Sequence, residues 1–502
     1  MSSLQIVSKL NHRLEQENIR YCHWKSNEHV DAAVQGKTDL DVLADRNEKV
    51  RLKQILAEIG FKQFQSVSYL TYIEIEDYVA MDETTGTLVH LHLHYQLELG
   101  EKNLKGYHCP WEKLLLSSRI YDQEHQIYIA EPNIEIIILI VRAALKVRNR
   151  DLLKNLLGSD YFQGDFIREF RWLKQKIDLS QVKELSEELL GKNAAKMILD
   201  AIVDEADLQQ LLSPRNAIRL ALKQYKRYDP MTAIRLRWYR EAQYLFFKAL
   251  NRYFNAPVNT KRSSINQGGA IIAILGADGA GKSTVSAEIV KGLSSKIDVF
   301  PLYLGSGDGS ASMLRQPLIW IRKAVKILRS RYTPEKLATN KTKPKKWYKR
   351  SKIYQLNHIL WAIALVYEKR NKLKQANLAK NRGMIVVCDR YPQSQIPEFN
   401  EGHLLSTEKV SSFKLLQTLQ QWELRAYQEM EATMPPDLVI KLNVSPEVAL
   451  SRKSSLTEVI ENKVAAVRAI KFPHQTTVTN LDADLPLDEV ILQAKHTVWQ
   501  NL

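Results

Sequence analysis

Cysteine is scarce in this sequence, with three residues in a chain of 502. Cys22, Cys109 and Cys388 are odd in number and far apart. They therefore form neither the framework of a small disulfide-rich protein nor the paired spacing of a zinc site. We expect reduced thiols in a cytoplasmic protein.

Long apolar runs are missing as well. The best candidate, Ile136 to Val141, is bounded by Glu135 and Arg142, which predicts a buried helix rather than a membrane span. The N-terminus has no basic region followed by an apolar core, so we expect no secretory signal. An apolar content of 45% and a charged content of 25% are typical of a globular protein, and the length predicts two or three domains.

Acidic residues are almost absent from one long stretch. Between Arg315 and Arg382 there are 20 Lys and Arg against two acids, although the whole chain has a net charge of +16. Within this basic insertion, 315–382, the spacing predicts an amphipathic helix over 318–328. Three roles suit it: a solvated face over a packed core, a funnel for an anionic substrate, or a contact with an anionic membrane surface. No recognised nucleic-acid module accompanies it.

Three regions follow one another along the chain. Residues 1–130 mix strand and helix patterns and predict an α+β domain, and residues 131–254 have helical spacing. Residues 255–269 are polar, lack periodicity and are typical of a linker. From 270 to 502, strand and helix patterns alternate, which predicts an α/β fold with a parallel sheet wrapped by helices.

The most informative motif follows the first strand pattern of that last region. An apolar run, 271–275, leads into a glycine-rich loop and then into a helical pattern, 285–293. In this context a G-x-x-x-x-G-K-[ST] sequence binds phosphate, because glycines let backbone N–H groups approach phosphate oxygens. Lys282 is placed to reach the β- and γ-phosphates, and Ser283 to hold Mg²⁺. The predicted nucleotide-binding residues are Gly276, Ala277, Asp278, Gly279, Ala280, Gly281, Lys282, Ser283 and Thr284.

A second motif places an acid at the end of an apolar run. Residues 384–387 predict a buried parallel strand that delivers Asp389 to the carboxyl edge of the sheet, where ligands bind in such folds. There Asp389 can hold Mg²⁺ through its water shell, and Arg390 can bind a phosphate in bidentate fashion. The alternative is that both residues only cap a helix.

A third motif predicts a strand followed by a helix rich in cations. Residues 437–444 predict another core strand, and Pro446 suits the first position of the next helix. That helix carries Arg452 and Lys453 toward the segment 454–468, which suits a mobile lid whose cations close over a transferring phosphoryl group. A solvated basic helix end is the alternative.

In their order along the chain, these motifs resemble the thymidylate kinase branch of the P-loop nucleoside monophosphate kinases, over roughly 270–502. The residues that carry the resemblance are the Asp-Gly-Ala-Gly-Lys-Ser-Thr loop, Asp389-Arg390-Tyr391, Pro436-Asp437-Leu438 with Ser445-Pro446-Glu447, and the Leu481-Asp482-Ala483 ending. The resemblance implies that the loop binds the phosphates of ATP, that Asp389 serves Mg²⁺, and that Arg390 contacts the substrate phosphate.

The acceptor side departs from that family. Where the family has an Arg-Glu-Pro-Gly stretch that contacts thymidylate, this chain has the segment from Tyr303 to Gly309, and the basic insertion replaces the usual base-recognition helix. Asp308 is a candidate acceptor-side group or simply a turn residue. The resemblance therefore supports phosphoryl transfer but leaves the acceptor open.

The N-terminal region carries a second possible site. Alternation along a strand places Asp39 and Asp41 on one face, which suits two carboxylates that share a divalent metal. With Lys25 and Ser26 upstream, this pattern resembles the nucleotidyltransferase superfamily over about 130 residues.

That superfamily usually supplies a third carboxylate from a neighbouring strand, whereas here the strand 88–95 carries histidines. His90, His92 and His94 share a face, so an imidazole could replace the missing ligand, which gives a candidate site of Asp39, Asp41 and His92. A half-buried polar strand face, or a degenerate binding domain, remains the alternative.

The sequence thus predicts a cytoplasmic phosphotransferase that uses ATP and Mg²⁺. The acceptor is a small phosphorylated compound, with a nucleoside monophosphate as the leading candidate, and a homodimer is possible. The predicted catalytic residues are Lys282, Asp389, Arg390, Arg452 and Lys453. Two alternatives stay open: nucleotidyl transfer at Asp39 and Asp41, or a nucleotide-binding protein without catalysis.

Overall fold

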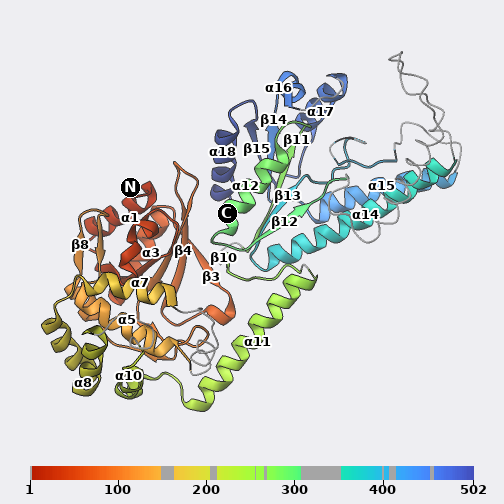
Figure 1. Ribbon diagram of the computed structural model, residues 1–502. Helices are drawn as coiled ribbons and strands as arrows, with labels where there is room; N and C mark the ends of the chain where they lie inside the picture. The colour runs from red at the N-terminus through yellow and green to blue at the C-terminus, as the bar shows by residue number, and fades with distance from the viewer. Residues whose placement is uncertain are drawn as a thin grey trace, which may run out of the picture. The chain divides into compact units, whose positions relative to one another are not determined.

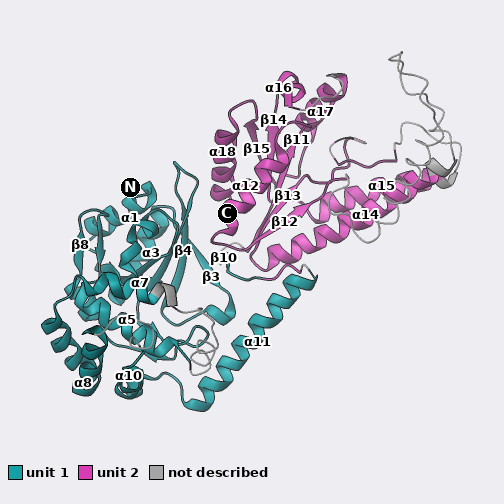
Figure 2. Ribbon diagram, viewed as in Figure 1, with its two compact units in different colours: residues 1–255, 259–266 teal, residues 256–258, 267–502 magenta. Residues whose placement is uncertain are grey.

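The computed structural model describes residues 3–148, 163–203, 212–254, 256–264, 268–306, 352–397, 399, 401–405, 414–452 and 457–502. The chain divides into two compact units, which we describe separately (Figure 2). Unit 1 comprises residues 1–255 and 259–266, and unit 2 comprises residues 256–258 and 267–502. Among the described residues, no helix has the length and apolar character needed to cross a membrane.

Unit 1 is built on a mixed sheet of eight strands in the order β10-β3-β4-β5-β2-β1-β9-β8 (Figure 1). These strands are β1 (Tyr21–His23), β2 (Leu40–Ala44), β3 (Lys62–Ser66), β4 (Ile75–Met81), β5 (Leu88–His94), β8 (Ile120–Asp122), β9 (Ile127–Ile129) and β10 (Arg262–Ser264). A separate pair is formed by β6 (Glu98–Leu99) and β7 (Tyr107–His108). The combination of this sheet with helices confirms the α+β prediction.

Apolar residues and histidines alternate along β5, so the two faces of the sheet carry different side chains. Val89, Leu91 and Leu93 enter a buried cluster with residues of α1 (Gln5–Gln16) and α3 (Lys49–Glu58). Because side chains alternate along a strand, the three histidines of β5 point to the opposite face. The other described helices of unit 1 are α2 (Val30–Val34), α4 (Glu112–Ser118), α5 (Pro132–Lys146), α7 (Gln163–Lys174), α8 (Leu179–Val203), α10 (Arg215–Ala221) and α11 (Pro230–Phe254).

The helix α5 confirms the prediction of a buried helix around 136–141. It begins at Pro132, and the carboxylate of Glu131 caps it by accepting hydrogen bonds from Asn133 N and Ile134 N. Its residues belong to the same buried cluster as Trp24 and Leu43. The helices α5, α7, α8 and α10 thus share a hydrophobic core with the N-terminal sheet, whereas α11 has no buried residue.

The segment predicted as a linker, 255–269, contains a strand. Residues 262–264 form β10, which pairs antiparallel with β3 at one edge of the sheet. Three residues are too few to show a period, so this strand has no signal in the sequence. Arg262 forms an ion pair with Asp77 of β4, with Nε and Oδ1 3.3 Å apart.

A buried carboxyl in α5 makes the stability of unit 1 dependent on pH. Glu135 is 1% exposed, and burial together with the charge of Glu169 raises its pKa to about 8. The folded protein therefore binds an extra proton between the unfolded pKa near 4.5 and about pH 8, so stability falls as pH rises through this window. We expect a loss on the order of 3 kcal/mol between pH 5 and pH 8 from this group.

Thermal unfolding of the wild type and of Glu135→Gln at several pH values measures this contribution. The variant cannot titrate at position 135, so its melting temperature is expected to fall less than that of the wild type as pH rises from 5 to 8. Parallel pH profiles for the two proteins would contradict the prediction.

Unit 2 is a sheet of five parallel strands in the order β12-β13-β11-β14-β15, which confirms the α/β prediction. The strands are β11 (Ala270–Gly276), β12 (Val299–Tyr303), β13 (Ile385–Asp389), β14 (Leu438–Asn443) and β15 (Thr477–Asp482). All seven residues of β11 are buried, as expected for a central strand covered on both faces.

Helices cover both faces of this sheet (Figure 1). One buried cluster joins the sheet to α14 (Lys352–Asn381) and α15 (Lys414–Thr433), while α12 (Lys282–Ser294) and α18 (Leu487–Gln500) pack together on the other side. Two further helices, α16 (Pro446–Arg452) and α17 (Thr457–Ala469), follow β14.

Only the last part of the basic insertion, 352–382, lies within the described residues, where it forms α14. The predicted helix over 318–328 and Asp308 lie outside them.

Several cations of α14 are tied to the rest of unit 2. Lys372 Nζ donates to Tyr303 O at 2.8 Å, and Lys380 Nζ lies 2.5 Å from Asp437 Oδ1. These cations hold α14 against strand ends of the sheet.

Candidate functional site

The glycine-rich loop connects the central strand β11 to α12 at the carboxyl edge of the sheet of unit 2. Gly279 and Gly281 have φ angles of 88° and 85°, a left-handed conformation that glycine adopts at no steric cost. Gly281 directly precedes α12, so the loop and the start of the helix direct N–H groups to one place. This is the arrangement that receives phosphate oxygens.

The two glycines differ in their surroundings, which gives a stability test. A Cβ on Gly279 would lie 2.7 Å from Ala449 O of α16, whereas a Cβ on Gly281 would meet no described atom within 4 Å. We expect Gly281→Ala to cost about 1–2 kcal/mol for its backbone conformation, and Gly279→Ala roughly 3 kcal/mol because a clash is added. Thermal unfolding without nucleotide compares the two variants, and equal losses would contradict the expectation.

Lys282 reaches back over the loop from the first position of α12. Its side chain is buried, and Nζ donates a hydrogen bond to Ala277 O at 2.8 Å. The hydrogen bond holds the ammonium group at the loop, and an ammonium carries three N–H donors. The structure thus brings the predicted phosphate-binding lysine to the loop itself.

Ser283 and Asp389 meet across the strand ends, as the roles predicted for them require. In the parallel register Ile274 of β11 pairs with Asp389 of β13, so the acid lies beside the start of the loop. Ser283 Oγ donates to Asp389 Oδ2 at 2.7 Å. The other oxygen, Asp389 Oδ1, is buried and has no hydrogen-bond partner among the described residues. A hydroxyl and a carboxylate with one unsatisfied, buried oxygen form a donor set that fits Mg²⁺.

Arg390 is held by a buried network of charges. Its backbone has a φ of 74°, rare for a residue with a side chain, and its N–H donates to Ile274 O at 3.1 Å. Arg390 Nη1 lies 2.7 Å from Glu401 Oε1, and Lys369 Nζ of α14 lies 3.2 Å from Glu401 Oε2. Two cations thus share one carboxylate, which leaves net positive charge at this end of the site.

Lys282, Arg390 and Glu401 line a cavity of about 110 Å³ within unit 2. The residues that line it are Leu275, Gly276, Asp278, Lys282, Ser306, Arg390, Glu401, Gly402, Leu404 and Lys463. The cavity places the phosphate-binding loop and Arg390 around one space.

Of the two predicted lid cations, only Arg452 lies within the described residues, and a different cation contacts the loop. Arg452 Nη1 donates to Ala483 O at 2.9 Å, and Lys453 lies outside the described residues. Instead Lys463 of α17 forms an ion pair with Asp278 of the loop at 2.6 Å. It lies in the segment 454–468 that was predicted as a lid, but nothing in the sequence separates it from neighbouring cations.

The packing of α17 explains why Lys463 reaches the site. Ile460, Val464 and Val467 are buried on one side of the helix, and Lys463 lies next to this side. Nothing in the sequence indicates that Glu401 and Lys369 lie near Arg390, because no local motif marks them.

In unit 1 the two predicted metal-binding acids have different partners. Asp39 Oδ1 lies 2.9 Å from His90 Nδ1, whose Nε2 lies 2.8 Å from Asp77 Oδ1. Asp41 Oδ1 lies 3.0 Å from His92 Nδ1 and 2.9 Å from Lys25 Nζ. The structure therefore brings Asp41 and His92 together and assigns Asp39 to a neighbouring network.

The charge states of the second network follow from its burial. Although burial favours a neutral carboxyl, Lys25 and hydrogen bonds from His92 and His94 keep the pKa of Asp41 well below its usual range. Burial lowers the pKa of His92, and burial together with His92 lowers the pKa of His94 further. Near neutral pH we expect a carboxylate beside two neutral imidazoles.

Two bacterial relatives are similar to part of the chain. The uncharacterized ATP-binding protein YghR of Escherichia coli is 29% identical over 238 residues, which are 45% of this chain and 86% of that protein. The uncharacterized ATP-binding protein YghS of the same species is 28% identical over 224 residues, 44% of this chain and 89% of that protein. No family model matches the chain.

Solved structures offer a more distant similarity. A deoxyadenosine kinase from M. mycoides with bound dCTP aligns over 45% of this chain and 98% of its own, with 19% identity and a TM-score of 0.25. A thymidylate kinase from Candida albicans aligns over 47% of this chain and 92% of its own, with 18% identity and a TM-score of 0.29. Because both TM-scores are low, the description of the fold of unit 2 rests on its own strand order.

Proposed function

We propose that unit 2 is an ATP-dependent phosphotransferase that moves the γ-phosphoryl group of ATP to a small phosphorylated acceptor. The observation that carries the proposal is that Lys282 and Arg390 line one cavity at the carboxyl edge of a parallel sheet, with the Ser283–Asp389 pair formed by the residues next to them in the sequence. Donor-side and acceptor-side groups for phosphoryl transfer are thereby next to each other.

The donor side follows from the loop. Its N–H groups and the N-terminus of α12 bind phosphate oxygens, and Lys282 neutralises charge on the β- and γ-phosphates. Support for ATP as the donor comes from YghR and YghS, which are both described as ATP-binding proteins.

Ser283 and Asp389 would hold Mg²⁺, on the strength of the orphaned oxygen of Asp389. When bound, this ion neutralises charge that develops on the phosphates during transfer. Ser283 and Asp389 would hold the positive charge of the ion at a fixed position beside the loop.

The acceptor side is built around Arg390. Glu401 uses part of its guanidinium, and the remaining N–H groups are available to orient an acceptor phosphate. An oxygen of that phosphate attacks the γ-phosphorus while the bond to the β,γ-bridging oxygen breaks, which releases ADP. A nucleoside monophosphate is the leading acceptor, given the resemblance of the motifs to thymidylate kinases.

A screen with γ-labelled ATP and Mg²⁺ tests the proposal against nucleoside monophosphates, nucleosides and phosphosugars. We expect label transfer to at least one phosphorylated acceptor and formation of ADP. Tight ATP binding measured by calorimetry, together with no transfer in the whole screen, would instead support a non-catalytic nucleotide-binding protein.

Nucleotidyl transfer by unit 1 is the second proposal, since Asp39 and Asp41 lie two residues apart at the start of β2. It requires both acids on metal, and in the structure each acid has its own histidine partner. If it holds, Asp39→Asn abolishes activity and Lys282→Met leaves it intact, the reverse of the order expected for unit 2.

A further inference from the structure

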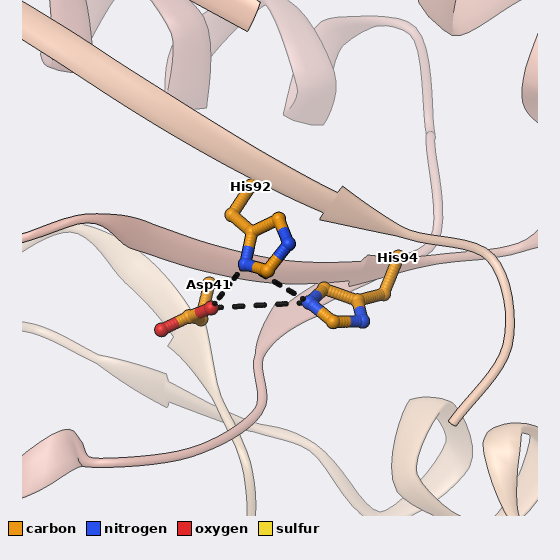
Figure 3. A group of neighbouring side chains, drawn as sticks. All are labelled: Asp41, His92 and His94. Carbon is orange, nitrogen blue, oxygen red and sulfur yellow. Dashed lines mark hydrogen bonds and ion pairs between the residues drawn. The ribbon is translucent and has the colours of Figure 1, made fainter. Parts of the chain in front are cut away.

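Three side chains of unit 1 point their ligand atoms at one another (Figure 3). Asp41 Oδ1 lies 3.0 Å from His92 Nδ1 and 3.8 Å from His94 Nε2, and the two nitrogen atoms are 3.4 Å apart. The three atoms form a compact triangle that lies outside the phosphotransfer site.

The dimensions of this triangle match those of a metal centre. Zinc-class ions bind imidazole nitrogen and carboxylate oxygen at about 2.0–2.2 Å, so neighbouring ligand atoms lie roughly 3.0–3.4 Å apart in tetrahedral or octahedral geometry. Two of the three edges fall in this range. The third needs a change of about 0.4 Å, which small side-chain rotations supply.

The backbone fixes this arrangement. In the parallel pairing of β2 with β5, Asp41 lies opposite His92, and His94 follows on the same face of β5. His94 also packs edge-on against Trp24, with ring centroids 5.1 Å apart. Two ligands from adjacent strands and a third two residues along are therefore set before any ion arrives.

One side of the triangle remains accessible. The side chain of His94 is 1% exposed, whereas those of His92 and Asp41 are 21% and 16% exposed. A bound ion would thus have three protein ligands and an open position for water or a small ligand, which is typical of catalytic rather than structural sites.

We propose that Asp41, His92 and His94 form a binding site for a divalent transition-metal ion of the zinc class. Two imidazole nitrogens favour Zn²⁺ or Co²⁺ over Mg²⁺, which prefers oxygen ligands. Asp39, the neighbouring acid of the predicted pair, lies outside this group of three and pairs with His90, which also pairs with Asp77. This site is independent of the function proposed for unit 2.

Lys25 opposes metal binding most directly, and Lys105 adds positive charge near His92 and His94. Lys25 Nζ lies 2.9 Å from Asp41 Oδ1, the same oxygen that faces the two imidazoles. An arriving ion must displace this ammonium group and remain near its positive charge. The effect of replacing Lys25 therefore distinguishes a metal site from a carboxylate that only pairs with a lysine.

Titration of the untagged, chelator-treated full chain with Co²⁺ and Zn²⁺ tests the proposal. Visible absorption of Co²⁺ reports nitrogen ligands, and calorimetry with Zn²⁺ gives the stoichiometry. We expect one ion per chain and affinity at least about 100-fold weaker in His92→Asn and His94→Asn. His108→Asn, another histidine of unit 1, and Asp389→Asn, at the phosphate site, are expected to bind Zn²⁺ like the wild type.

Lys25→Met sharpens the test, because it removes the competing charge while Asp41 and the histidines stay. We expect it to tighten Zn²⁺ binding by about tenfold. His92 is partly exposed, so His92→Asn should stay folded, which circular dichroism checks, and its result decides the matter even if His94→Asn does not fold. Absence of Zn²⁺ binding in the wild type, or unchanged binding in His92→Asn, overturns the proposal.

Discussion

Lys282→Met is expected to lower the rate of phosphoryl transfer from ATP by about 10²–10³-fold while the protein stays folded. The lysine is buried, and its Nζ lies 2.8 Å from Ala277 O, so the charge is held at the loop before any phosphate binds. Methionine keeps most of the side-chain volume but removes the charge that stabilises the phosphates as negative charge develops. Steady-state and single-turnover rates with labelled ATP and the best acceptor of the screen measure the effect.

Lys291→Met is the matched control. Lys291 lies on the same helix, its side chain is 78% exposed, and it forms an ion pair with Glu288 at 3.5 Å. We expect a rate within about twofold of the wild type, since an exposed i,i+3 pair contributes little. If Lys282→Met kept more than about a tenth of the wild-type rate, the chemistry would not take place at this loop.

Asp389→Asn is expected to lower the transfer rate by about 10²-fold or more and to raise the Mg²⁺ concentration needed for half-maximal rate by at least about tenfold. The substitution keeps the shape of the side chain and its contact with Ser283 but removes the negative charge from the oxygen that has no hydrogen-bond partner in the described part of the chain. A magnesium titration of the rate, at saturating ATP, measures both effects.

A double-mutant cycle with Ser283→Ala tests whether the two residues act on one ion. Because both would contact the same Mg²⁺, their effects on the transfer rate are expected to be less than additive. Additive effects, or a magnesium dependence that Asp389→Asn leaves unchanged, would show that the 2.7 Å contact between them is only structural.

The donor side of unit 2 could be predicted because its geometry is local. The loop from Gly276 to Thr284 needs only a strand before it and a helix after it, and both are encoded within a few residues. Asp389 could be predicted by one further rule, namely that parallel strands end at the same edge of a sheet. The pairing of Ile274 with Asp389 shows that the rule applies here.

On the proposed acceptor side the sequence predicted Arg390 but not the residues that hold it, because these come from distant segments. Lys369, Arg390 and Glu401 meet only after α14 has packed on the sheet. Lys463 contacts the loop because of which side of α17 is buried, whereas Arg452, at the end of α16, donates to Ala483 O. Neither outcome leaves a repeating pattern in the sequence.

The N-terminal site was predictable in part. Alternation correctly placed the three histidines of β5 on one face, but strand register decides which acid each of them meets. The pairing of Asp41 with His92 moved the candidate metal site from Asp39 and Asp41 to Asp41, His92 and His94.

The attachment of α14 bears on how this protein can diverge. Lys369, Lys372 and Lys380 tie the helix to Glu401, to Tyr303 O and to Asp437, at three points around the sheet. Arg390 is held by contacts with Glu401, which pairs with α14, and with the ends of the neighbouring strands β11 and β12. We therefore expect the segment between Ser306 and α14 to tolerate changes in length, because these contacts among the described residues hold the charged groups around the cavity.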